Sequence, residues 1–445
     1  MIGWTDTTVA ELIADGVLER PMDGNHGAIH PKTSDFVCEG IPFIMASDMK
    51  NNRVDLESCS CISEEQARSL RKGFAKTGDV LLSHKATIGR TAIVGEINTP
   101  FVMLTPQVTY YRILRPEILD RRYLSYYFRS REFRHIFEQW AGAGSTRAYI
   151  GITDQTRLPI RFPDIATQTS IAGLIGVLDD KIDLNRRMSA TLEEMARALY
   201  RSWFVDFDPV HARAVGQPPA HMDPTTAALF PDSFGPDGLP KGWESCPLSE
   251  LCIQVKKVVK PMDAPASAFL HFSLPAFDAG RLPIHELGEA IKSNKAHVPH
   301  DAILFSRLNP STPRVWWAKT AGIDGIPAAS TEFFVAAAHD PVETPWLYCL
   351  LSSSDFLDEA LSRVTGTSNS HQRVPPKALA EIEVIAPSPE TVEAFGDLTG
   401  PWFEKIHTMA QESQTLATLR DSLLPRLISG ELRIREAEKQ VEEVA

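Results

Sequence analysis

The chain has 445 residues, of which 43% are hydrophobic and 23% charged, a composition that provides for two to four folded domains and excludes a mainly disordered protein. No run of about 18 apolar residues occurs, and the N-terminus lacks a basic start followed by an apolar stretch, so neither a membrane span nor a signal peptide is expected. The six cysteines are scattered without a CxxC pair, which favours reduced thiols in a cytoplasmic protein over a zinc site or disulfides.

The net charge of −12 argues against uniform attraction to nucleic acid, but the charge is unevenly distributed. Residues 1–165 carry 20 basic and 20 acidic side chains, and the remaining residues carry 25 and 37. Residues 68–90 hold six Arg and Lys against Asp79 alone, and residues 112–134 hold seven Arg against three acids. The latter stretch, with its interleaved aromatic residues, predicts an amphipathic helix. Both stretches are candidates for DNA contact, because phosphate attraction acts over short distances in salt; a solvated face is the alternative.

The chain contains one unit twice. Residues Trp4–Leu12 reappear as Trp243–Leu251, a shift of 239 residues, and Asp79–Leu82 reappears as Asp301–Leu304, a shift of 222. Each of the latter pair is an apolar run followed by polar residues and is predicted to be a strand leading into a loop. Two further matches are Gly144–Thr146 with Gly366–Ser368 and Leu158–Pro163 with Ile382–Pro387. The first copy thus has about 17 extra residues near its start, and residues 20–40 have no evident counterpart.

Each copy ends in a heptad pattern. Apolar residues recur at alternating spacings of four and three from Ile171 to Trp203 and again, 224 positions later, from Phe395 to Leu427. The two segments are predicted to pair as an antiparallel coiled coil; packing of each helix on its own domain alone is the alternative. Pro401 and Pro425 predict a shorter or kinked second helix. The seam residues include Ile171, Ile175, Leu178, Ile182, Asn185, Leu192, Leu199, Trp402, Ile406, Met409, Leu416 and Leu423.

Polar residues interrupt this seam at Asn185, Ser189, Ser413 and Arg420. We expect them to fix the register and the antiparallel partner at some cost in stability. Simple solvent exposure in a shallow seam is the alternative.

The predicted fold is therefore mixed α/β, with a pseudo-twofold internal repeat of two globular domains separated by two long paired helices. The expected domains are residues 1–165 (first globular domain), 166–206 (first helix), 207–240 (a linker with seven prolines), 241–390 (second globular domain) and 391–445 (second helix and acidic C-terminal tail).

No nucleotide-binding loop or zinc-protease motif is present. Asp164, Asp179 and Lys181 match the spacing of a metal-dependent nuclease motif, but Asp179 and Lys181 fall two residues apart on the heptad helix and so face different directions. No catalytic or metal-ligating residue is predicted. A nuclease centred on these three residues and a coiled-coil scaffold without DNA binding are kept as alternatives.

Several segments resemble one family. Thr167–Ile175 and Ala198–Val210 closely resemble the central conserved region of type I restriction–modification specificity subunits. Gly78–Ser83 and Ala143–Ile160 are similar to landmarks of the target-recognition domains of that family, and Leu423–Leu432 resembles its distal conserved region. The resemblance covers nearly the whole chain.

The resemblance implies a non-catalytic DNA-binding subunit. Each of its two target-recognition domains would read one half of an asymmetric bipartite site in double-stranded DNA, and its helices would set the separation. The helices would dock two methyltransferase subunits, and restriction (endonuclease/translocase) subunits would join them. S-adenosylmethionine would belong to the methyltransferase subunits, ATP and Mg to the restriction subunits, and no cofactor to this chain.

Loops at matching positions of the two copies are predicted to face DNA. Arg and Asn can make bidentate contacts to bases, whereas Ser, Thr and Lys more often hold phosphates; solvated loop residues are the alternative. The candidates are Ser83, His84, Lys85, Thr87, Arg90, Ser145, Thr146, Arg147 and Tyr149 in the first copy, and Ser306, Arg307, Asn309, Arg314, Thr367, Ser368, Asn369, His371 and Arg373 in the second.

Overall fold

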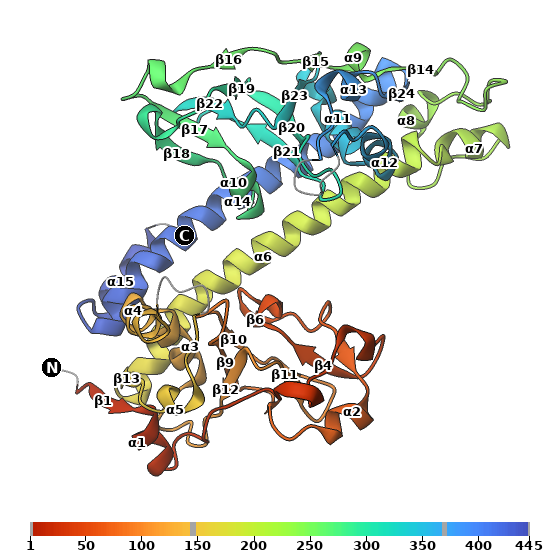
Figure 1. Cartoon of the computed structure of the whole chain (residues 1–445). Coiled ribbons are helices and arrows are strands. Elements are labelled where there is room, and N and C mark those ends of the chain that lie inside the picture. The colour runs from red at the N-terminus through yellow and green to blue at the C-terminus, as the bar shows by residue number, and fades with distance from the viewer. Residues whose placement is uncertain (1–2, 143–147, 367–371, 444–445) are drawn as a thin grey trace. The chain divides into compact units, whose positions relative to one another are not determined.

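The computed structural model describes residues 3–142, 148–366 and 372–443, which form two compact units (Figure 1). The first unit comprises Met1–Leu184 with Glu412–Ala445, and the second comprises Asn185–Gln411. Each unit contains sheets, short helices and parts of two long helices, so the predicted mixed α/β class is confirmed.

In the described part of the first unit, β1 (Thr5–Thr8) pairs antiparallel with β13 (Pro159–Phe162). A six-stranded sheet has the order β2-β12-β9-β10-β6-β5, and a five-stranded sheet has the order β3-β7-β4-β11-β8. The strands are Met22–Asp23 (β2), Phe36–Val37 (β3), Ile41–Ile44 (β4), Met49–Lys50 (β5), Asn52–Val54 (β6), Cys61–Ile62 (β7), Phe74–Ala75 (β8), Val80–Ser83 (β9), Thr91–Ile93 (β10), Val102–Leu104 (β11) and Val108–Tyr111 (β12). The helices are Val9–Ala14 (α1), Glu64–Ser69 (α2), Arg121–Arg129 (α3), Arg131–Trp140 (α4), Ile152–Gln155 (α5) and Ile434–Glu442 (α15).

The described part of the second unit repeats this plan. β14 (Glu244–Pro247) pairs antiparallel with β24 (Glu383–Ala386), and the larger sheets have the orders β15-β23-β20-β21 and β16-β19-β22-β17-β18. The strands are Ile253–Gln254 (β15), Val258–Val259 (β16), Ala268–Phe272 (β17), Ile284–Leu287 (β18), Lys295–His297 (β19), Asp301–Ser306 (β20), Val315–Lys319 (β21), Ile326–Ala329 (β22) and Phe333–Ala337 (β23). The helices are Asp208–Ala214 (α7), Pro224–Ala228 (α8), Leu248–Leu251 (α9), Leu274–Asp278 (α10), Thr344–Ser352 (α11), Ser354–Ser362 (α12) and Pro376–Ala380 (α13).

The central strand of each copy has a continuous apolar run, Val80–Leu82 in β9 and Ala302–Phe305 in β20, because both of its faces are covered. Val80 and Leu82 of β9 pack in the core that includes the helices, whereas Leu81 packs in a separate core on the other face. In β20, Ile303 and Leu304 alternate between two cores in the same way. This alternation follows from the two-residue period of a strand, and it confirms the predicted strands at these matching positions.

The extra residues of the first copy are spread along its early part. β2 pairs with β12 in the first copy, and β15 pairs with β23 in the second. Residues 22–23 of β2 therefore correspond to β15, a match that the sequence repeat does not reveal. β4 runs parallel to β11 as β17 runs parallel to β22. The two copies therefore share the central part of the pairing scheme and differ at the sheet edges, where β5, β6 and β3 occur in the first copy alone and β16 in the second alone.

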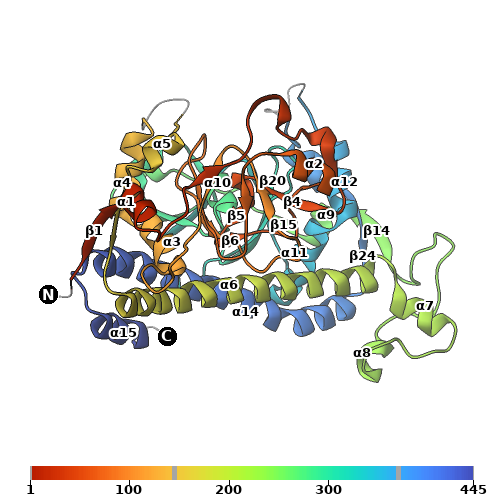
Figure 2. The same ribbon diagram turned by 90° about the horizontal axis from the view of Figure 1, so that it is seen from below.

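The two long helices are α6 (Ile165–Phe204) and α14 (Pro389–Ser429), of 40 and 41 residues (Figures 1 and 2). Asp164 caps the start of α6 by accepting a hydrogen bond from Thr167 N at 3.0 Å. Within the first unit, Asp179 contacts Arg420 and Lys181 contacts Glu412, so the helices run antiparallel there, as predicted.

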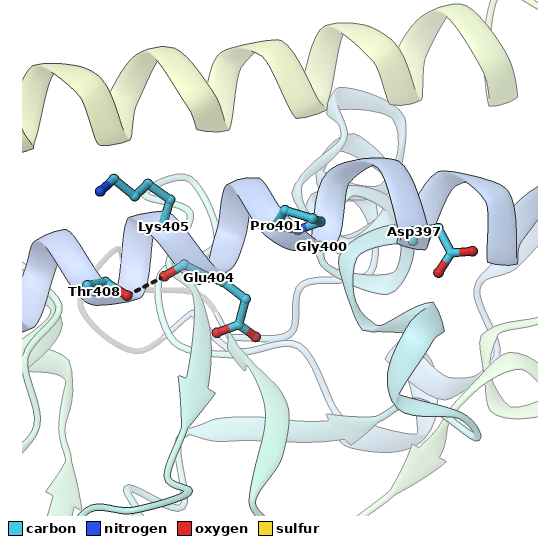
Figure 3. Close-up of a pocket in the computed structure, with 7 residues that line it drawn as sticks. Asp397, Gly400, Pro401, Glu404, Lys405 and Thr408 are labelled. Atoms are coloured by element: carbon cyan, nitrogen blue, oxygen red, sulfur yellow. Dashed lines mark hydrogen bonds between the residues drawn. The ribbon is translucent and has the colours of Figure 1, made fainter. Parts of the chain in front are cut away.

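The prediction that proline shortens the second helix is wrong. α14 continues through both Pro401 and Pro425, since packing of its apolar face outweighs the loss of one backbone hydrogen bond at each proline. Beside Pro401 lies a hollow of about 700 Å³ on the surface of this helix (Figure 3). It is lined by Gly396, Asp397, Gly400, Pro401, Glu404, Lys405 and Thr408.

Residues 112–134 do not form the single helix that was predicted. Ser130 ends α3 and caps α4, accepting a hydrogen bond from Phe133 N at 3.2 Å. Arg112 lies before both helices and forms ion pairs with Glu19 and Asp79. The aromatic residues of this region are core residues, as expected: Tyr110, Tyr111, Tyr123, Tyr126, Tyr127 and Phe128 are buried.

The proline-rich segment 207–240 is less irregular than predicted. It contains α7 and α8, each with a proline in its first turn. Val210 and Phe230 are buried in the core of the second unit, and Phe230 packs edge-on against Trp203 with 5.1 Å between ring centroids. The segment therefore contributes to the core of the second unit along part of its length.

Among the described residues, none of the helices combines the length and apolar character that a membrane crossing requires. All six cysteines are free thiols; three are buried, and Cys38 is exposed.

Candidate nucleic-acid interface

In the first unit, the loop after β9 is fixed by backbone hydrogen bonds to two other segments. His84 N donates to Gln107 O at 2.9 Å, and Ala86 N donates to Ala148 O at 3.1 Å. Ile150 N donates back to His84 O, also at 3.1 Å. The loop is thus held between the residue that precedes β12 and the residues that precede α5.

The second unit repeats these bonds after β20. Arg307 N donates to Glu332 O at 2.8 Å, Asn309 N donates to Gln372 O at 3.0 Å, and Val374 N donates to Arg307 O at 3.0 Å. The same backbone arrangement therefore presents different side chains in the two copies.

The turn conformation is also shared. Ala86 and Asn309 both have positive φ, 63° and 49°, which L residues seldom adopt and which asparagine tolerates better than alanine. Isolated β-bridges join Lys85 to Tyr149 and Leu308 to Arg373. The predicted loop residues that the structure describes are thus brought together within each copy.

Side chains of the first-copy loop divide into buried and exposed groups. Ser83 is fully buried, and its Oγ accepts a hydrogen bond from Arg90 N at 2.8 Å. His84 is also fully buried, with its Nδ1 2.9 Å from Ile150 O, and burial lowers the pKa of its imidazole. The prediction that these two side chains face DNA is wrong, because they hold the loop in place.

The exposed first-copy candidates are Lys85, Thr87, Arg90 and Tyr149. Lys85 Nζ lies 6.0 Å from the centroid of the Tyr149 ring. Arg90 Nη1 donates to Ala46 O at 2.9 Å, which fixes its direction.

In the second copy, Ser306 is buried and donates to Leu308 O at 3.0 Å, so the prediction that it faces DNA is wrong as well. Arg314 is bound to both carboxylate oxygens of Asp278, at 2.7 and 2.9 Å. Arg307 Nη2 donates to Thr331 O at 2.5 Å.

Arg373 is the more exposed arginine of this loop, with 41% of its side chain accessible, and it is ion-paired with Glu332. Asn309 is half-buried beside the bridge to Arg373.

Seven predicted site residues lie outside the described residues: Ser145, Thr146, Arg147, Thr367, Ser368, Asn369 and His371. Sequence analysis also missed Gln107 and Glu332, which occupy the same place in the two copies. Each directly precedes a strand of the repeat, so extending the repeat alignment to β12 and β23 would have identified them.

The predicted seam residues are buried in the first unit and at Asn185 and Met409, and the other four seam residues of the second unit are partly buried. Ile171, Ile175, Leu178, Ile182, Asn185, Met409, Leu416 and Leu423 are buried, and Leu192, Leu199, Trp402 and Ile406 are partly buried. Asn185 Nδ2 donates to Met409 O at 3.5 Å, a contact between positions that are equivalent in the repeat. The interpretation of Asn185 as a register-fixing residue is consistent with this contact.

Asp179 has a structural role. Its carboxylate accepts hydrogen bonds from Arg129 and Arg420, both at 2.7 Å, and from the hydroxyl of Tyr126 at 3.1 Å. Burial by itself would raise the pKa of Asp179, but the two guanidinium groups hold it below its usual range. Lys181 pairs instead with Glu412, so the residues of the nuclease motif do not converge. No group of His, Cys, Asp or Glu able to hold a metal ion occurs in the described ranges.

A repeated tyrosine anchors each globular part to the helices. Tyr126 on α3 donates to Asp179, and Tyr348 on α11 donates to Glu193 at 2.5 Å. Arg281 and Arg197 complete the second cluster by pairing with Glu193. Equivalent tyrosines thus contact different positions of α6.

The chain is similar to known proteins of one family. Residues 28–194 match the model of the type I restriction modification DNA specificity domain. The chain is 26% identical to the type I restriction enzyme HindI specificity subunit of Haemophilus influenzae, over 88% of this chain and 94% of that one. It is 23% identical to the type I restriction enzyme MjaIX specificity subunit of Methanocaldococcus jannaschii, over 89% and 88%.

The fold is similar to that of a solved structure, the S subunit of a type I restriction–modification system from M. genitalium. The TM-score is 0.52 at 16% identity, and the match covers 96% of each chain. The match to the specificity-domain model over residues 28–194, the two relatives that align over most of the chain and the shared fold all show similarity to type I restriction–modification specificity subunits.

Proposed function

We propose that this chain is a DNA specificity subunit of a type I restriction–modification system and that it reads an asymmetric bipartite site, with one globular part for each half-site. The observation that carries the proposal is the loop arrangement that both copies share. The same backbone hydrogen bonds bring Gln107 and the exposed Tyr149 together in one copy and Glu332 and Arg373 together in the other. Two loops with the same backbone arrangement and different side chains are suited to reading two different base sequences.

The helices are proposed to set the distance between half-sites and to dock two methyltransferase subunits, with restriction subunits joining that assembly. S-adenosylmethionine would be bound by the methyltransferase subunits, and ATP and Mg by the restriction subunits. A groove of about 1000 Å³ between α4 and α14 of the first unit supports a docking role. Its lining carries Arg131, Arg134 and His135 together with Glu132, Glu138 and Asp421, so the groove offers charges of both signs to a partner surface.

The first test exchanges one domain. The chain with residues 241–390 replaced by those of another family member, co-expressed with its methyltransferase subunit, is expected to methylate a motif altered in one half only. Sequencing of methylated host DNA measures this. A change in both halves, or in neither, would contradict one domain per half-site.

Binding to the duplex should also weaken steeply with salt, because phosphate contacts release counterions. A filter-binding series with the purified subunit, with and without Mg²⁺, measures this slope. Salt-independent binding would favour a scaffold without DNA contact, and cleavage that requires Mg²⁺ would favour a nuclease.

The second test lengthens both helices. Four residues inserted between Asn185 and Arg186, and four between Thr408 and Met409, would add about 6 Å to each helix. Duplex DNA rises about 3.4 Å per base pair, so the methylated half-sites are expected to stand one or two pairs further apart. Insertion near Gln168 is unsuitable, because its side chain anchors α6 through bonds to Asp120 N and Pro163 O.

A matched control carries the insertion in α6 alone. It is expected to lose activity, because a four-residue shift in one helix misaligns the paired seam. An active double insertion that keeps the original spacer would show that the helices do not measure the DNA.

A further inference from the structure

The pair formed by Glu332 and Arg373 occupies the shared loop arrangement of the second unit. Nε of Arg373 lies 3.0 Å from Oε2 and 3.2 Å from Oε1 of Glu332, and Nη2 lies 3.0 Å from Oε1. The carboxylate therefore engages the Nε and Nη2 edge of the guanidinium. A guanidinium has five N–H donors in a planar fork, so the end formed by Nη1 and Nη2 keeps donors for a second bidentate contact.

Exposure gives this free end access to a ligand. The Arg373 side chain is 41% accessible and that of Glu332 is 25% accessible. Arg314, the other ion-paired arginine of the loop, is 16% accessible and reaches Thr312 O at 3.4 Å through Nη1. Arg314 is thus committed to the protein, whereas Arg373 is oriented and partly open.

The backbone also fixes both partners of the pair. Glu332 O accepts the hydrogen bond from Arg307 N, and Thr365 N and O both bond to the backbone of Arg373. A side chain that is held before binding loses less conformational freedom when a ligand arrives, which favours selective recognition over a loose phosphate contact.

The first copy lacks this chemistry. Its residues at the same two places are Tyr149, with 47% of its surface exposed, and Gln107. A tyrosine beside a glutamine offers an aromatic ring and neutral hydrogen-bonding groups. Neither side chain carries a positively charged group that can donate two hydrogen bonds to one base, as the guanidinium of Arg373 can.

We propose that Arg373, positioned by Glu332, reads a guanine in the major groove of the half-site bound by the second domain, and that Tyr149 makes the first domain read its half-site without such a contact. The inference rests on the proposed function, since it assigns chemistry to one of the two half-sites. Arginine binds the O6 and N7 acceptors of guanine end-on, the geometry that the free end of Arg373 allows.

The experiment begins with the motif that the wild-type subunit and its methyltransferase methylate in host DNA. Duplexes of that motif are then made with each guanine of the second half-site replaced in turn by 7-deazaguanine, which lacks the N7 acceptor. Wild-type binding is expected to fall about fivefold or more at one guanine. In Arg373→Ala, binding to the normal motif falls roughly 5- to 150-fold, and the penalty for 7-deazaguanine at that position disappears.

Glu332→Gln tests the positioning role. The variant should lose discrimination at the same base pair, while its binding to random duplex stays constant or rises because a negative charge is removed. A residue needed only for folding would not change the preference for one base pair.

Two matched controls accompany these variants. Glu359→Gln removes a carboxylate from a similar pair on α12, where Arg363 binds Glu359 Oε1 at 2.9 and 2.7 Å, and should leave the motif unchanged. Tyr149→Ala should affect the first half-site alone. Circular dichroism melting confirms that each variant is folded.

The outcomes separate the two proposals. Methylation without a bipartite motif would overturn the proposed function. A bipartite motif with Arg373→Ala weakened equally for all sequences would identify a phosphate contact and overturn the inference alone. The same holds if the 7-deazaguanine penalty persists in Arg373→Ala, or if Glu332→Gln keeps full discrimination.

Discussion

Replacing Asp179 with alanine is expected to lower the free energy of unfolding of the first unit by about 3–5 kcal/mol. The Asp179, Arg129 and Arg420 side chains are only 17%, 18% and 17% exposed, so little water replaces the lost carboxylate. Arg129 would keep its charge in a half-buried place, and Arg420 would keep only the exposed Asp421. Urea denaturation followed by circular dichroism measures the loss.

Asp180 provides the matched control. It is adjacent on α6, is 58% exposed and pairs with Arg53, so Asp180→Ala is expected to cost less than about 1 kcal/mol. A triple replacement of Asp179, Arg129 and Arg420 by apolar residues of similar size should recover much of the stability. Equal losses in the free energy of unfolding for Asp179→Ala and Asp180→Ala would show that the buried ion pairs of Asp179 stabilise the fold no more than an exposed pair does.

Acidification is expected to destabilise the second unit through His407 on α14. Burial, with a smaller contribution from the charge of Lys319, lowers the pKa of His407 to about 4. In the unfolded chain the imidazole titrates near pH 6.5, so the unfolded state binds the proton first. The contribution of the neutral His407 to the free energy of unfolding is therefore fully present above about pH 6.5 and decreases as the pH drops. Below about pH 4 the free energy of unfolding is lower by about 3 kcal/mol.

The replacement His407→Leu should flatten this part of the stability profile, because leucine does not titrate and suits contact with the Trp317 ring, 5.8 Å away. The exposed His285 provides a control for loss of an imidazole. Urea titrations between pH 7 and pH 4 measure the slope. A wild-type profile retained in His407→Leu would assign the acid sensitivity to other groups.

The parts of the fold that the sequence predicts are those governed by short-range periodicity. β9 and β20 are apolar over consecutive residues, and the alternation of four and three in the helices identifies their buried seam. Copies at a fixed offset strengthen both predictions, because a pattern that occurs twice is less easily accidental.

Predictions failed where tertiary contacts outweigh local preference. Pro401 and Pro425 are poor helix residues, yet α14 continues through them because its neighbours hold it. Ser130 divides the arginine-rich segment into two helices by capping α4. The position of this break depends on how the aromatic residues on either side pack into the core.

Long-range pairs were hardest to predict. Glu332 lies 41 residues from Arg373 and meets it through the bridge that joins Leu308 to Arg373 and the bond from Arg307 N to Glu332 O. Asp179 resembled a nuclease ligand by its spacing, and only the positions of Arg129 and Arg420 reveal that its charge is neutralised within the protein.

The pairing of the first and last strands of each copy has an evolutionary consequence. β1 lies beside β13 and β14 beside β24, at the strand spacing of about 4.8 Å. The chain therefore enters and leaves the globular part of each copy at one place. A recombination event with its endpoints in these strands replaces a whole domain and leaves the long helices intact. With one globular part for each half-site, as proposed, a lineage would inherit a new half-specificity in a single genetic step, whereas stepwise substitution would pass through subunits that recognise neither sequence well.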